Sequence, residues 1–170
     1  EFLKNRGIEC PSVFGDPALL LPRFYTPQRM EKRYKLGIIP HVIDWDYDVM
    51  RKIRKERNDI LVIDLAHYDK WTDVIDQICS CEAIASSSLH GLIVSDAYNV
   101  PNCWITLSGK ISGGLFKYFD YFSSVGREEA GPVKVERMSD LQKIENKMVS
   151  WKPIAIDTGP ILQSCPFYRA

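Results

Sequence analysis

Residues 85–101 read ASSSLHGLIVSDAYNVP, and this stretch is the most informative part of the chain. Its apolar residues repeat at the spacing of one helix face, which predicts an amphipathic helix. They are Leu89, Leu92, Ile93, Ala97 and Val100. The short apolar segment Ala83–Ala85 comes before this helix and is interpreted as a buried strand. The stretch therefore predicts a strand that leads directly into a helix.

The start of this helix carries polar groups suited to an anion. Ser86, Ser87 and Ser88 stand where a hydroxyl accepts a hydrogen bond from an otherwise unpaired backbone N–H. The same end presents free N–H groups and the positive end of the helix dipole, which suit a phosphate or carboxylate. His90 falls in the first turn, off the apolar stripe, so we expect its ring at the same mouth.

Outward from this stretch, short apolar runs alternate with helical patterns from Tyr34 onward, which is typical of βαβ units. Strands are predicted at Leu36–Pro40, Ile60–Leu65, Ala83–Ala85, Cys103–Leu107 and, as an edge strand, Val133–Glu136. Further helices are predicted at Asp46–Glu56, Trp71–Ile78, Leu115–Ser124, Ser139–Val149 and Gly159–Phe167. The continuous apolar run Ile60–Leu65 is typical of a central strand buried on both faces. The pattern predicts a three-layer α/β/α Rossmann-like domain with a mostly parallel sheet.

Residues 1–33 do not fit this alternation. Glu1–Arg6 resembles the last turn of a helix, and Gln28–Tyr34 is polar enough for a linker. A chain of 170 residues is too short for two complete domains. We therefore expect the tail of another domain plus a linker at 1–33, and one Rossmann-like domain at 34–170.

Composition excludes several functional classes. Lys plus Arg and Asp plus Glu both number 22, so the balanced charge does not indicate nucleic-acid binding. No apolar stretch approaches the roughly 18 residues of a membrane span, and no signal-peptide pattern is present. The 5 cysteines include no CxxC pair, and Cys79 and Cys81 are placed in a predicted helix. We expect reduced thiols in a cytoplasmic protein, with no metal or cofactor required.

The 3 histidines of the chain each follow a predicted strand: His41, His67 and His90. Parallel strands share a carboxyl edge, where ligands of open α/β sheets bind. For His67 the alternative is a loop cap, and for His41 an orienting role at the start of the next helix. The aromatic band Tyr118–Phe122 is interpreted as core packing.

The motif is also similar to a family signature. Ser86–Pro101 resembles that of the polysaccharide pyruvyl transferase family, which has a Ser-Ser-(Arg or Ser)-Leu-His-Gly core and an Ala-Tyr-x-x-Pro ending. Gly15–Pro22 resembles the family's Gly-Asp-Pro-Ala segment, and residues 35–41 and 120–127 resemble further blocks. Many members have arginine where this chain has Ser88.

The resemblance implies the carboxyl-terminal lobe of a GT-B-like enzyme with its cleft between two Rossmann-like domains. Such enzymes transfer the enolpyruvyl group of phosphoenolpyruvate to a sugar of a cell-surface polysaccharide or its lipid-linked precursor, as a pyruvate ketal. The amino-terminal lobe, with a catalytic arginine, would be missing, so we expect this chain to be inactive alone. The partners implied are phosphoenolpyruvate and a sugar acceptor, with self-association through the uncovered lobe surface.

In this interpretation His90 is the catalytic residue. The expected substrate-binding residues are Ser86, Ser87, Ser88, Leu89, Gly91, His41 and His67. Two alternatives stay open: the donor-binding lobe of a GT-B glycosyltransferase that uses a nucleotide sugar, and a non-catalytic sugar-binding or scaffold module. The expected location is the cytoplasm, or the inner face of the membrane as a peripheral protein.

Overall fold

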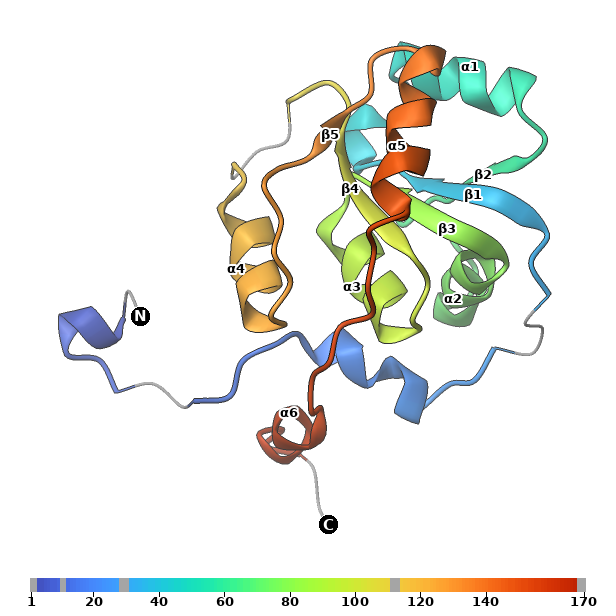
Figure 1. The fold of residues 1–170 in the computed structure, drawn as a ribbon. Helices are drawn as coiled ribbons and strands as arrows, with labels where there is room; N and C mark the ends of the chain where they lie inside the picture. Colours follow the sequence, from blue (N-terminus) through green and yellow to red (C-terminus); the bar gives the residue numbers. More distant parts are fainter. Residues whose placement is uncertain (1–2, 10–11, 28–30, 111–113, 168–170) are drawn as a thin grey trace.

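The computed structural model describes residues 3–9, 12–27, 31–110 and 114–167. Its centre is a sheet with the strand order β2-β1-β3-β4-β5, in which every pair is parallel (Figure 1). The strands are β1 (Tyr34–Ile39), β2 (Ile60–Val62), β3 (Cys81–Ser86), β4 (Asn102–Thr106) and β5 (Val133–Lys134). The predicted α/β class and parallel sheet are confirmed.

Helices cover both faces of this sheet (Figure 1). They are α1 (Asp48–Glu56), α2 (Trp71–Cys79), α3 (Leu89–Ala97), α4 (Phe116–Ser124), α5 (Leu141–Met148) and the short α6 (Gly159–Gln163). One face packs against α1 and α5, and the other packs against α2, α3 and α4. This arrangement gives the three layers expected from the alternating sequence pattern.

The two layers of core follow from the alternation of side chains along each strand. Ile38 of β1 and Ile105 of β4 pack with apolar residues of α1 and α5. Ile39, the next residue of β1, packs instead with α2, and Trp104 of β4 packs with α3 and α4. Because both faces of the inner strands are covered, the middle residues of those strands are apolar, as in residues 83–85 of β3 and 103–105 of β4.

Three sequence expectations are corrected by the structure. Of the run Ile60–Leu65, residues Ile60–Val62 form the strand β2, which lies at the edge of the described sheet and not in its centre, because β2 pairs with β1 alone. Helices cover both faces of β2, so its residues are apolar even though one of its edges has no partner strand in the described sheet. Cys81 begins β3 and is not helical. Asp140, not Ser139, stands at the N-cap of α5, because the short 3₁₀ helix η4 (Met138–Asp140) comes first.

Residues before β1 pack onto the same core. The 3₁₀ helix η2 (Pro17–Arg23) begins at Asp16, whose carboxylate accepts a hydrogen bond from the Ala18 N–H at 2.8 Å. Leu19 and Leu20 are buried in the cluster that contains α3 and α4 residues. Part of the segment expected as a tail therefore lies against the Rossmann-like layers.

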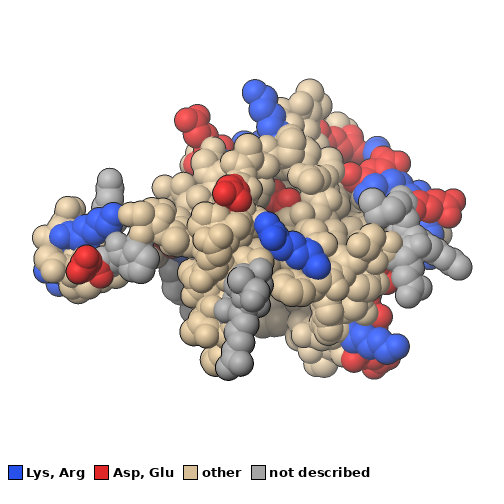
Figure 2. All heavy atoms as spheres, turned by 90° about the horizontal axis from the view of Figure 1, so that it is seen from below, with Lys and Arg blue, Asp and Glu red and all other residues tan. Residues whose placement is uncertain are grey.

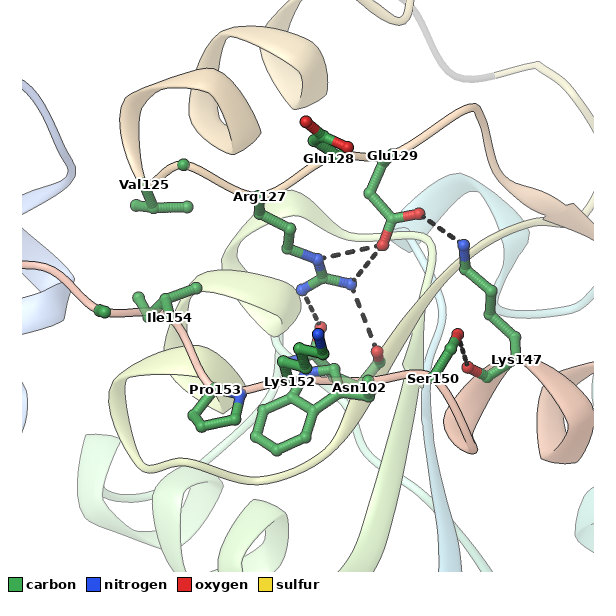
Figure 3. Close-up of a pocket in the computed structure, with 13 residues that line it drawn as sticks. Asn102, Val125, Arg127, Glu128, Glu129, Lys147, Ser150, Lys152, Pro153 and Ile154 are labelled. Carbon is green, nitrogen blue, oxygen red and sulfur yellow. Dashed lines mark hydrogen bonds and ion pairs between the residues drawn. The ribbon is translucent and has the colours of Figure 1, made fainter.

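A buried charge network joins β4, the loop after α4 and α5 (Figure 3), and it reaches the carboxyl end of α3 through Asp96. The Arg127 guanidinium donates to the Asp96 carboxylate at 3.2 Å, to Asn102 Oδ1 at 2.6 Å and to Glu129 at 2.7 Å. Lys147 of α5 pairs with the other Glu129 oxygen at 3.0 Å. A hollow of about 500 Å³ lies over this network. Since the guanidinium is committed to protein partners, we assign the network a structural role.

Gly91 allows α3 to approach the sheet closely. A Cβ at this position would overlap with Ser86 Oγ and would lie 3.0 Å from two side-chain carbons of Ile39. Both neighbours are fully buried, so neither can move away easily. The glycine of the motif is therefore required by packing between α3, β1 and β3.

We expect Gly91→Ala to lower the free energy of unfolding by about 1–3 kcal/mol, the usual cost of overpacking. Gly159→Ala is the matched control, because its new Cβ would meet only the exposed Asp157 carboxylate, at 3.1 Å. Urea unfolding of both variants measures the difference. Equal stabilities of the two would contradict the packing role of Gly91.

Candidate functional site

The strand order places a topological switch point between β1 and β3. The chain leaves β1 toward β2 on one side, whereas β3 and β4 extend the sheet on the other. Open α/β sheets bind ligands at such a point, outside the carboxyl ends of the strands. Ile39 of β1 pairs with Ser86 of β3 here, so the motif serines lie at this edge.

Two motif serines tie the ends of β1 and β3 together. The Ser87 N–H donates to the Ile39 carbonyl at 3.0 Å, and the His41 N–H donates to Ser87 Oγ at 2.9 Å. Ser86 Oγ accepts from the Ser88 N–H at 3.0 Å and lies 2.7 Å from the Ser88 carbonyl oxygen. Ser86 and Ser87 are fully buried, so both hydroxyls serve this junction.

Ser88 differs from the other two serines. It occupies the N-cap of α3, is partly exposed, and its hydroxyl makes no capping hydrogen bond. The first intrahelical bond of α3 is formed by the Leu92 N–H, which donates to the Ser88 carbonyl. In the described residues, the N–H groups of Leu89, His90 and Gly91 have no acceptor. These three donors and the Ser88 hydroxyl give α3 a start of the kind that suits an anion.

His90 is exposed in this first turn of α3, as the motif predicted. Leu89 is partly buried and Gly91 is buried against Ser86 and Ile39. No lysine or arginine in the described part of the chain pairs with a residue of Ser86–Gly91. The exposed His90 imidazole is therefore the titratable side chain that a ligand at this helix start can contact.

Residues of α4 and β4 also pack against the junction between β1 and β3. The Tyr118 hydroxyl donates to the Ser87 carbonyl at 2.6 Å, and its ring stacks on Trp104 at 4.6 Å between centroids. Burial raises the pKa of Tyr118 to about 12, and the nearby Asp44 carboxylate adds to this effect. Tyr118 thus packs in the core, as expected, and also holds the serine junction.

Asp44 and Ser108 were not recognised as site neighbours from the sequence. Asp44 is fully buried in the 3₁₀ helix η3 (Val42–Asp44) after β1, and Ser108 after β4 donates a short hydrogen bond to it. The contact spans 64 residues of sequence, so no local pattern indicates it. It fixes the loop after β4 against the end of β1.

The other two histidines take different places on the same edge. His41 Nδ1 accepts a hydrogen bond from the Ile43 N–H at 3.4 Å, which caps η3 and agrees with the orienting role. The His41 backbone joins the Ser87 junction, whereas the His67 side chain, after β2, pairs with Asp64. The structure thus joins His41 to the motif through Ser87. His67 contacts Asp64 of its own loop and makes no described hydrogen bond to the motif.

Neither a metal-ligand cluster nor a membrane-spanning helix is found in the described residues. No group of three or more His, Cys, Asp or Glu side chains there is arranged to hold a metal ion. No described helix has the length and apolar character needed to cross a bilayer. Figure 2, which views the molecule from below, shows positive and negative side chains interspersed with neutral ones, without a broad region of either sign.

Comparison with known proteins agrees with the motif. The family model described as polysaccharide pyruvyl transferase matches residues 1–109, which include the whole helix start. The chain is 34% identical over 118 residues to the uncharacterized protein L143 of Acanthamoeba polyphaga mimivirus. It is 28% identical over 111 residues to the succinoglycan biosynthesis protein ExoV of Rhizobium meliloti (strain 1021).

These alignments cover 68% and 65% of this chain but only 41% and 34% of the two relatives. The part of the chain that matches therefore covers less than half the length of either relative. No solved structure matches the chain significantly.

The two kinds of serine give a testable difference. We expect Ser87→Ala to lower the free energy of unfolding by about 1–3 kcal/mol, because the His41 N–H loses its acceptor. Ser88→Ala is the matched control and should change it by less than about 0.5 kcal/mol, since the Ser88 hydroxyl caps nothing. Urea unfolding compares them, and an equal loss in both variants would contradict the assignment.

Proposed function

Because the chain belongs to the polysaccharide pyruvyl transferase family, we propose that it takes part in moving a pyruvyl group from phosphoenolpyruvate to a sugar. The family match over residues 1–109 supports this proposal. The name of the Rhizobium meliloti relative, a succinoglycan biosynthesis protein, supports a polysaccharide or its lipid-linked precursor as the acceptor.

The proposed reaction replaces the phosphate ester by two sugar oxygens. The first hydroxyl oxygen bonds to C2 of phosphoenolpyruvate while C3 takes up a proton and becomes a methyl group. The second hydroxyl oxygen then bonds to C2 as the bond from C2 to the phosphate oxygen breaks. Of the two hydroxyl protons, one balances the proton gained at C3 and one leaves on the phosphate.

The start of α3 is the observation that carries the proposal. Three N–H groups without acceptors, from Leu89, His90 and Gly91, converge there with the positive end of the helix dipole. The phosphate of phosphoenolpyruvate is the group that such a cradle favours. His90, exposed in the same turn, stabilises the negative charge of the phosphate or delivers a proton.

Ser88 gives this helix start a different chemistry from members that carry arginine at the same motif position. Its free hydroxyl donates one hydrogen bond to an anion, without adding a charge. We propose that the backbone N–H groups and the imidazole supply the remaining stabilisation. His41, whose backbone joins the cradle through Ser87, lines the same site.

We further propose that residues 34–170 form one wall of a two-lobed cleft and that residues 1–33 lead to the other lobe. The greater length of both matched relatives is compatible with a second wall. Experiments on activity therefore use the natural full-length protein.

We expect His90→Ala to reduce phosphate release from phosphoenolpyruvate about 10²–10⁴-fold, the usual loss when one positioned acid or base is removed. A coupled phosphate assay with a sugar diol measures the rate. Gln142→Ala, an exposed change on α5, is the control and should keep the wild-type rate. Near-normal turnover by His90→Ala would end the assignment.

A binding panel separates the proposed function from nucleotide-sugar transfer. Phosphoenolpyruvate and the diphosphate sugars of uridine, guanosine and cytidine are titrated against the wild-type protein by calorimetry. We expect saturable heat only with phosphoenolpyruvate. Binding of a nucleotide sugar in its place favours a GT-B glycosyltransferase, and no binding of either favours a module without catalysis.

A further inference from the structure

The loop after β2 holds a histidine in a defined orientation. Asp64 Oδ1 accepts hydrogen bonds from the N–H groups of Ala66, at 2.7 Å, and His67, at 3.3 Å. The other carboxylate oxygen lies 2.9 Å from Nδ1 of the His67 ring. The His67 side chain is 88% exposed, whereas that of Asp64 is 22% exposed. The loop therefore anchors Asp64, and Asp64 in turn anchors the imidazole.

This pairing determines which ring nitrogen is available to a ligand. Burial opposes ionisation of Asp64, but the Ala66 and His67 N–H groups and the His67 ring lower its pKa below the ordinary value. An ionised carboxylate only accepts hydrogen bonds, so the ring nitrogen that faces it carries the proton. In the neutral ring, Nε2 then presents a lone pair to the solvent.

The imidazole borders a shallow hollow of about 600 Å³ along the start of α2. The hollow is lined by Ala66, His67, Tyr68, Asp69, Asp73 and Gln77. Two carboxylates and no lysine or arginine line it, so the charge of its side chains disfavours an anion such as phosphoenolpyruvate. Sugar hydroxyls, by contrast, donate to carboxylate oxygens and to Nε2 and accept from the Gln77 amide.

The hollow lies beyond the carboxyl end of β2, whereas the start of α3 lies beyond the carboxyl end of β3. β2 and β3 both pair with β1, so their carboxyl ends are separated by two strand spacings, roughly 10 Å. The His67 loop and the start of α3 therefore follow strand ends on the same edge of the sheet, which lets a saccharide in the hollow extend toward an anion held at α3. The difference in side-chain charge favours the anion at the helix start and the polyol at the carboxylates.

We propose that this hollow receives the acceptor saccharide and that His67 takes the proton from its attacking hydroxyl. This inference rests on the proposed function. The hydroxyl O–H bond breaks and its proton passes to Nε2. Its oxygen bonds to C2 of phosphoenolpyruvate while the electrons of the C2–C3 double bond take a proton delivered by His90, so that C3 becomes a methyl group. Asp64 is a positioning residue, which holds the ring with Nε2 toward the hydroxyl, as a carboxylate does in catalytic triads.

The test compares His67→Gln and Asp64→Asn in the natural full-length protein, with phosphoenolpyruvate and methyl β-D-glucopyranoside as substrates. We expect His67→Gln to lower kcat about 10²–10⁴-fold, with the KM for phosphoenolpyruvate changed less than about twofold. Asp64→Asn should lower kcat similarly and alter the ¹⁵N signals that report the His67 tautomer. Gln142→Ala on α5 is again the control, because Gln142 is exposed and lines neither this hollow nor the start of α3.

A second readout does not depend on turnover. The ¹⁵N-labelled His67 ring, assigned from its loss in His67→Gln, is followed while methyl β-D-glucopyranoside is added without phosphoenolpyruvate. We expect its signals to shift saturably in the wild type. Shifts without any phosphate release in the wild type overturn the proposed function but support the saccharide site. Phosphate release at the wild-type rate in His67→Gln, or no shift with the glucoside, overturns this inference and leaves the proposed function standing.

Discussion

The junction between the carboxyl ends of β1 and β3 is the constraint on which the site depends. Two buried serine hydroxyls and two backbone amides hold the strand ends together. With Ser86 and Ser87 committed to this junction, α3 begins at Ser88 with its first N–H donors unpaired. The hydroxyls of Ser86 and Ser87 are used in this junction and do not cap α3. The first backbone N–H groups of α3 are therefore left without acceptors.

The fold was predictable where one sequence pattern determines one local structure. The apolar spacing around Leu92 and Ile93 placed α3 correctly, and the alternating runs predicted the parallel sheet. Strand order was not predictable, because a run such as Ile60–Leu65 is apolar whether it lies at an edge or in the centre. The neighbours of a strand depend on pairing with distant segments, and the local spacing of apolar residues does not indicate this pairing.

The candidate site was predicted only in part for the same reason. The motif indicated an exposed His90 and a helix start, and both are present. It also assigned Ser86 and Ser87 to an anion, whereas their hydroxyls join two strands. The contact between Asp44 and Ser108 needs two distant segments to meet. The pairing of Asp64 with His67 spans three residues, yet it depends on the turn geometry of one loop.

The buried network around Arg127 has a consequence for the opposite end of α3. Asp96 near the carboxyl end of this helix is held by Arg127, Asn102 and the Tyr121 hydroxyl. Gly91 seats its amino end on the sheet. A helix clamped at both ends cannot tilt to meet an incoming charge. Its dipoles therefore stand ready before the ligand arrives, and little reorganisation energy is lost when the charge shifts during reaction.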